Sequence, residues 1–176
     1  MKKLLKSLLA VMLVAITAFS LASCGVNTDP VKAAENLSAK GYEVATLHDD
    51  GSLIAGTAAQ AGIEMAVAGF GVSASDVDYI VSGGKESEAD YETIVIYYCK
   101  TDDAANKIYE SYKGLYDELK KQIETAKEEA KTLTGEEKAE AEEAIKELED
   151  SYNDVSYGKS GMVVWVGSKA AVDATR

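Results

Sequence analysis

The chain has 176 residues and a formal net charge of −12, from 18 Lys or Arg, 30 Asp or Glu and a single histidine. A surface this acidic repels nucleic acid and anionic lipid headgroups, so the composition excludes a polyanion-binding function. The length suits one domain with its own core. The two cysteines, Cys24 and Cys99, provide neither a disulfide framework nor a CxxC zinc pattern.

The first 24 residues, MKKLLKSLLAVMLVAITAFSLASC, have the layout of a secretory signal. Lysines precede an apolar run of about 15 residues, which is shorter than the roughly 20 that a membrane-spanning helix needs. The run ends on Leu21-Ala22-Ser23-Cys24, which resembles the lipobox of bacterial lipoproteins. That resemblance implies cleavage before Cys24 by signal peptidase II and a diacylglycerol on the cysteine sulfur. A plain signal peptide and a transmembrane anchor are the alternatives.

This signal sets the predicted domain organisation. We expect a signal peptide at residues 1–23, a lipidated Cys24 with a tether to residue 30, and a single α+β domain over residues 31–176. The signal contains three lysines and no acid, so its removal changes the formal charge to −15. Attachment must therefore come from acyl chains rather than from a basic face. The expected location is the extracytoplasmic face of the cell membrane.

The first half of the mature chain alternates helix and strand patterns. Pro30 opens a helix that Gly41 ends. A strand is predicted over residues 42–47, followed by a turn, and a small-residue helix over residues 53–72 suits a position that is buried on more than one side. Further strands are predicted at residues 77–81 and 92–99, joined by a polar loop. The second of these is apolar on both faces, which favours a central position in a sheet.

The second half is dominated by a predicted helical hairpin over residues 102–152. Thr101 caps its first helix, and apolar residues recur at three-four spacing along both helices, as in a packing seam. Charges dominate between Glu124 and Glu147, so we expect the far end to project into solvent, as a solvated face or an interaction arm. Residues 153–161 are predicted to form a loop, followed by a last strand at 162–166 and a short helix at 169–174.

This order of elements predicts an α+β fold with a four-stranded antiparallel sheet. After the N-terminal helix the order is β-α-β-β-α-β, which is that of the ferredoxin-like split unit, with its second helix elaborated into the hairpin. In that topology the first and third strands lie in the middle of the sheet.

The aromatic residues are the candidates for a ligand site. Tyr109, Tyr112 and Tyr116 line adjoining positions of the long helix, and Trp165 lies on the last strand. Such rings stack on sugars or bind peptide through their hydroxyls, and they serve equally well as core. If a site exists, it is expected where this tyrosine row meets the sheet. His48, Asp49 and Asp50 suit a turn better than a metal site, and no metal or other cofactor is predicted.

No catalytic constellation is recognisable, because the chain lacks GxSxG and SxxK motifs and has a single histidine. The sequence therefore favours a non-catalytic, lipid-anchored binding or protein-interaction module of the bacterial cell envelope. A protein partner would bind through the helical hairpin. The alternative is a cell-envelope hydrolase that uses carboxylates, and paired carboxylates cannot be identified among 30 acids without geometry.

Overall fold

The fold is seen in a computed structural model, which describes residues 25–48, 55–86 and 91–176. The predicted signal peptide with Cys24, and the predicted turn after His48, lie outside these ranges. In chain order the elements are α2 (Pro30–Ala39), β1 (Glu43–His48), α3 (Ala55–Val67), the 3-10 turn η1 (Ala74–Asp76), β2 (Val77–Glu86), β3 (Tyr91–Cys99), α4 (Asp102–Ala130), α5 (Gly135–Asp154), β4 (Val155–Ser160), β5 (Val163–Ser168) and α6 (Lys169–Ala174).

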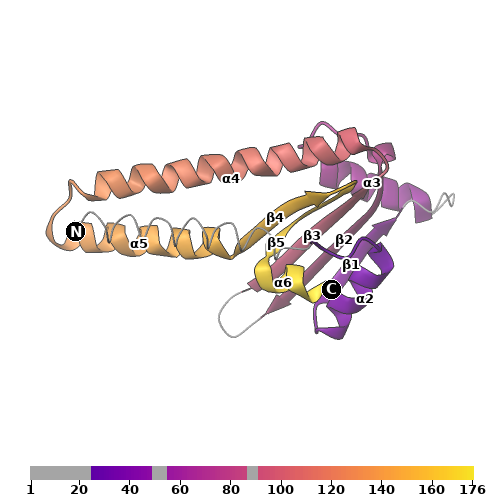
Figure 1. Cartoon of the computed structure of the whole chain (residues 1–176), viewed down its shortest axis with the longest axis horizontal. Helices are drawn as coiled ribbons and strands as arrows, with labels where there is room; N and C mark the ends of the chain where they lie inside the picture. The colour runs from indigo at the N-terminus through magenta and orange to yellow at the C-terminus, as the bar shows by residue number, and fades with distance from the viewer. Residues whose placement is uncertain (1–24, 49–54, 87–90) are drawn as a thin grey trace, which may run out of the picture.

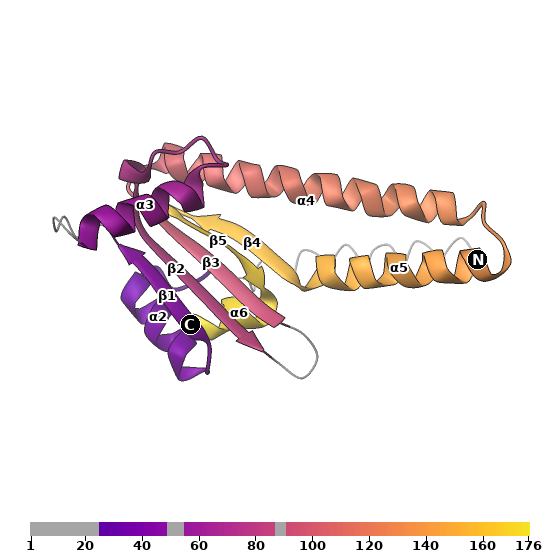
Figure 2. The ribbon, with the colours of Figure 1, turned by 180° about the vertical axis from the view of Figure 1, so that it is seen from behind.

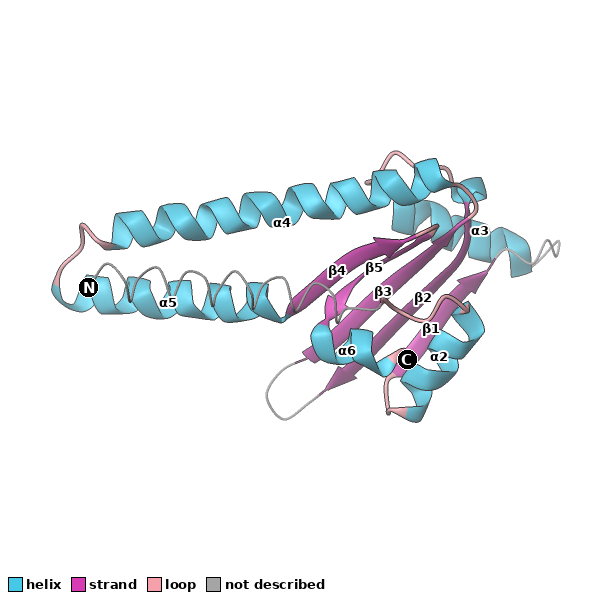
Figure 3. Cartoon of the chain, viewed as in Figure 1, coloured by secondary structure: helices cyan, strands magenta, loops and turns pink. Residues whose placement is uncertain are grey.

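The predicted α+β class is confirmed, with one antiparallel sheet of five strands in the order β1-β2-β3-β5-β4 (Figure 3). The expectation of four strands was wrong because residues 155–160, predicted as a loop, form β4. This strand is rich in serine and glycine, which have little tendency to form strands by themselves. It lies at the sheet edge, where hydrogen bonding to β5 stabilises it.

The strand order also differs from the expected ferredoxin-like layout. β3 lies in the middle of the sheet as predicted, but β1 forms an edge. The reason is that α3 returns the chain beside β1, so that β1 and β2 pair as antiparallel neighbours. Half of the β1 residues are exposed and none is buried, which is consistent with this edge position.

Two separate cores lie on the two faces of the sheet (Figures 1 and 2). One is formed with α2 and α6 and contains Ile94, Ile96 and Tyr98 of β3. The other is formed with α3 and α4 and contains Tyr97 and Cys99. Alternate residues of β3 therefore enter opposite cores, which explains why this central strand is apolar on both faces.

The helical hairpin, now α4 and α5, is confirmed and extends well beyond the sheet (Figure 1). Thr101 caps α4 by accepting a hydrogen bond from the Ala104 N–H at 3.2 Å. Far from the sheet the helices share a small core of their own around Ile123, Ala130 and Ile145. Other apolar residues of the hairpin, Leu115 and Leu148, are exposed rather than part of this seam.

Candidate functional site

The face of the sheet on the side of α3 and α4 is only partly covered by helices. Three cross-strand rows of side chains point to this side, and the row nearest the helices consists of Leu47, Ile80, Tyr97, Val164 and Lys159. Its central members are at most 4% exposed. The next row contains Ala45, Ser82, Val95, Val166 and Tyr157, and the last contains Glu43, Gly84, Thr93, Ser168 and Val155. Glu43, Ala45 and Thr93 are exposed, so cover on β1 and on the start of β3 ends after the first row, whereas Ser168 at the end of β5 is buried.

The two outer rows form the floor of an open surface that we call the sheet groove. It consists of two hollows of about 480 and 240 Å³ that share Tyr91, Thr93 and Val95. In Figure 2 the strands on this side lie bare below α3 and α4. The residues that line the groove are Glu43, Val44, Ala45, Ser82, Gly83, Gly84, Tyr91, Thr93, Ile94, Val95, Tyr116, Ser151, Asp154, Val155, Val166, Gly167 and Ser168.

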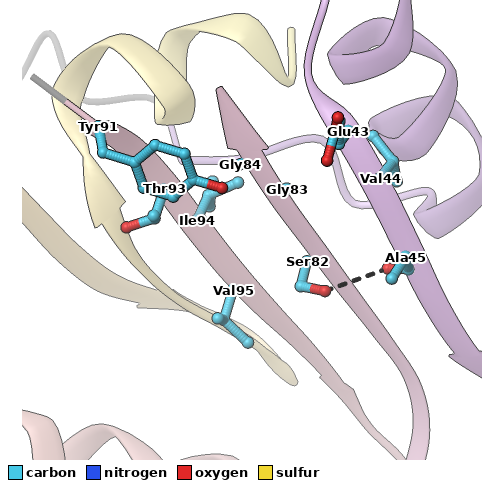
Figure 4. A pocket seen from close by; sticks show the side chains of 10 residues that line it. All are labelled: Glu43, Val44, Ala45, Ser82, Gly83, Gly84, Tyr91, Thr93, Ile94 and Val95. Carbon is cyan, nitrogen blue, oxygen red and sulfur yellow. Dashed lines mark hydrogen bonds between the residues drawn. The ribbon is translucent and has the colours of Figure 1, made fainter. Parts of the chain in front are cut away.

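Several residues of the groove floor are small or hydroxylated, so the floor does not project toward solvent. The Ser82 hydroxyl donates to the Ala45 carbonyl at 3.4 Å. Gly84 has no side chain, and the Tyr91 hydroxyl lies 2.5 Å from the position that a Cβ on Gly84 would take (Figure 4). Tyr91 is 60% exposed and belongs to both hollows, so its ring stands over the floor between them. The floor thus offers hydroxyl groups beside an aromatic surface.

The charges that line the groove are of one sign. Glu43 lies at the β1 edge and Asp154 lies at the opposite edge, directly before β4. None of the lining residues is Lys, Arg or His. Four strand spacings of about 4.8 Å separate the two edges, so the acidic ends are roughly 19 Å apart. The arrangement disfavours an anionic ligand and leaves room for an elongated one.

The tyrosine row meets the sheet at one end of this groove. Tyr116 lines the smaller hollow and stacks on Tyr157 of β4, with ring centroids 4.7 Å apart. Tyr109 also contacts Tyr157, at 6.2 Å between centroids. Tyr112 instead turns toward the core, where its hydroxyl lies 3.0 Å from that of Tyr97. Of the three predicted residues, the structure therefore places Tyr116 at the groove and uses Tyr109 and Tyr112 as packing.

Trp165 lies on the other face of the sheet, away from the tyrosine row. It is 4% exposed and belongs to the core beneath α2 and α6. The ring packs on Gly158, where a Cβ would be 2.4 Å from the indole carbon Cζ2, and on Gly25. Its indole N–H is buried without a hydrogen-bond partner among the residues described. Trp165 and the tyrosine row are thus not brought together, because neighbouring residues of a strand point to opposite faces.

Residues 25–29, expected as part of a tether, pack against the domain, and we call them the N-terminal strip. The Arg176 Nε and Tyr98 hydroxyl donate to the carbonyls of Gly25 and Asn27, both at 2.8 Å. The Asn27 N–H donates to the Thr175 hydroxyl at 3.4 Å. Val26 is buried in the core with Trp165. The residue that follows Cys24 is therefore held on the surface of the domain.

The comparisons with known proteins leave the family open. No family model, curated protein or solved structure matches the chain.

Two further findings concern the part of the chain that the structure describes. Within residues 25–48, 55–86 and 91–176 no helix is both long and apolar enough to cross a bilayer. The same ranges contain no group of three or more His, Cys, Asp or Glu side chains placed to hold a metal ion.

Most groove residues were not predicted from the sequence, because the predicted candidates were aromatic side chains. Small residues on a strand give no functional signal by themselves, and Asp154 is one of many acids. The available signal is confined to polar Ser82 beside Val81 and polar Thr93 beside Ile94, which indicates strands with one solvated face. The solvated faces that lie next to each other are set by the strand order, and the order predicted from the sequence was wrong because it placed β1 in the middle of the sheet.

Proposed function

We propose that the chain is a lipid-anchored, extracytoplasmic binding module of the bacterial cell envelope, without catalytic activity, and that the sheet groove binds its ligand. The lipobox-like Leu21-Ala22-Ser23-Cys24 supports the anchor and the location. The observation that carries the binding role is the groove itself, which is long and open rather than deep. Such a surface suits contact along an extended ligand.

The composition of the groove indicates the class of ligand. Carboxylates at both ends favour amino or guanidinium groups, and the hydroxyls of Ser82 and Thr93 suit a polar backbone between them. Six extended residues span about 20 Å, which matches the roughly 19 Å between the acidic ends. The ligand we propose is an elongated segment that is cationic at its ends.

The alternative of a hydrolase that uses carboxylates finds no support in this groove. Glycosidase-type catalysis needs two carboxyl groups about 5–9.5 Å apart. Glu43 and Asp154 lie at opposite edges of a five-stranded sheet, at roughly twice that separation. They cannot act on one bond together.

Peptide titration tests the groove. We expect a hexapeptide of alternating Ala and Lys to shift the amide NMR signals of β1, β2 and β3 residues that line the groove, and the matching Ala and Glu peptide to leave them unchanged. Replacing Thr93, in the middle of the floor, adds bulk and positive charge. Thr93→Arg is therefore expected to weaken binding at least tenfold.

A matched variant separates groove binding from general attraction to an acidic surface. Thr125 is exposed on α4, outside the groove, and Thr125→Arg changes the charge by the same amount. It is expected to alter the affinity less than twofold. Equal weakening by both variants, or signal shifts confined to the hairpin, would show that the groove is not the binding site.

A further inference from the structure

We propose that the surface formed by the N-terminal strip, α2 and α6 faces the bilayer, so that the sheet groove opens away from the membrane. We call this surface the anchor face. The inference rests on the proposed acylation of Cys24 and adds an orientation to it. A lipid anchor on a loose tether would allow every orientation of the domain, whereas the structure ties the anchoring point to one face.

The first step is the position of the anchoring point. Cys24 is bonded to Gly25, and consecutive Cα atoms are 3.8 Å apart, so the acyl chains begin within one residue of Gly25. Gly25 lies against the ring of Trp165 and its carbonyl accepts from Arg176. The bond from Tyr98 to Asn27 and the burial of Val26 hold the next two residues. The lipid is thus joined to a fixed point of the domain.

The second step is the charge of the surface around that point. Segments 25–41 and 168–176 contain four basic residues, Lys32, Lys40, Lys169 and Arg176, and three acidic ones, Asp29, Glu35 and Asp173. The hairpin, residues 102–154, has 17 acidic residues and 8 lysines. Anionic headgroups repel the hairpin and leave the anchor face nearly unaffected. In this orientation the surface nearest the headgroups is formed by segments with almost no net charge.

The third step is the relation between the two faces of the sheet. The N-terminal strip, α2 and α6 pack on the core of Trp165 and Tyr98, whereas the groove opens on the opposite side, beside α3 and α4 (Figures 1 and 2). A bilayer beneath the anchor face leaves the groove open to solvent. The orientation thus gives an extracytoplasmic ligand free access to the proposed site.

Fluorescence quenching in vesicles measures this orientation. The acylated chain is purified in a Cys99→Ala background with a single probe at Lys32→Cys on the anchor face or Thr93→Cys in the groove. Both positions are exposed. The labelled protein is then placed in vesicles of phosphatidylcholine and phosphatidylglycerol that carry a nitroxide quencher on the headgroup. We expect the probe at residue 32 to be quenched at least threefold more than the probe at residue 93.

Releasing the strip provides the control. Arg176→Ala with Tyr98→Phe removes the bonds to Gly25 and Asn27, so the two probes are expected to approach equal quenching while the protein still floats with the vesicles. Equal quenching without these substitutions, in a protein whose mass shows acylation, overturns the orientation alone. A protein that lacks the acyl mass and does not float overturns the anchor and, with it, the orientation.

Discussion

Burial decides the chemistry of Cys99, the cysteine that lies outside the lipobox-like segment. Its side chain lies in the core beside α3 and α4 and is 6% exposed. Desolvation, with a smaller contribution from Asp76, raises the pKa of this thiol to about 11. A reactive cysteine needs a lowered pKa and access to solvent. Cys99 is a structural residue.

The raised pKa of Cys99 predicts a loss of stability at alkaline pH. The unfolded thiol ionises at about pH 9, and the folded one at about 11. The stabilising contribution of the buried, protonated thiol is therefore complete below pH 9 and is lost as the pH rises toward 11. We expect the difference in unfolding free energy between the native chain and Cys99→Ala to fall by about 1 kcal/mol between pH 8 and pH 10.

Urea denaturation of both proteins at pH 8 and pH 10 measures this difference. Both proteins contain the same buried tyrosines, whose pKa values burial also raises, so their contribution cancels when one unfolding free energy is subtracted from the other. An unchanged difference would show that the thiol is not desolvated.

Two glycines predict opposite effects of the same substitution. Gly158 packs on Trp165, and a Cβ there would lie 2.4 Å from the indole ring, so Gly158→Ala should destabilise the fold by about 1–3 kcal/mol. Gly114 is exposed in the middle of α4 with nothing within 4 Å of a Cβ. Gly114→Ala should stabilise by about 0.5–1 kcal/mol, because glycine is a poor helix former. Thermal unfolding distinguishes the two signs, and a neutral Gly158→Ala would contradict the packing of Trp165.

At the scale of the elements, the distal hairpin is independent of the sheet. Its core of Ile123, Ala130 and Ile145 contains no strand residue, whereas Ala104, Ala105 and Ile108 at the base of α4 belong to the sheet core. The ion pair between Lys127 and Glu149 also joins α4 to α5 alone. A projecting acidic arm of this kind is suited to a basic protein partner, which we keep as a proposal for the hairpin.

This independence predicts the result of shortening the hairpin. Replacing residues 120–150 with a short Gly-Ser loop should reduce the helical circular dichroism signal and leave a cooperative unfolding transition, because neither sheet core is opened. A partner that binds the arm should be lost in a pull-down at the same time. Ile108→Ala is the contrasting variant, since it should cost about 2–5 kcal/mol through a cavity in the sheet core. Complete unfolding of the shortened chain would show that the distal hairpin is part of the fold.

At the scale of the whole molecule, the chain combines a charge asymmetry with two distinct sheet faces. The acid is concentrated in the hairpin, and the anchor face has nearly equal numbers of both signs. The lipid attachment that we propose would then depend on the acyl chains, at about 0.8 kcal/mol per buried methylene, rather than on surface charge.

The proposed lipid attachment predicts the behaviour of a single variant. Cys24→Ala removes the acylation site, so the protein should move from the membrane fraction to the soluble or culture fraction. Inhibition of signal peptidase II by globomycin should block processing of the native chain and leave the variant unaffected. A variant that still floats with membranes, or a native protein with residues 1–23 attached, would contradict the anchor.

Local patterns were sufficient for much of the fold. The apolar strand at β3, the cap at Thr101, the distal part of the hairpin seam and the terminal helix 169–174 each depend on residues near in sequence, and the structure confirms them. β4 was missed although Val155, Tyr157 and Lys159 alternate with small residues. An edge strand of this composition is stable only through its partner, and pairing with β5 is not a local property.

The sequence by itself determined the composition of each element, the acidic arm and the lipobox-like signal. The tertiary structure decided which elements adjoin. Strand order placed β1 at an edge, put Trp165 and the tyrosine row on opposite faces, and left two rows of side chains only partly covered, so that they form the groove. The physical reason is that period-two alternation assigns a residue to a face of its own strand, while the neighbour across the sheet is set by long-range packing.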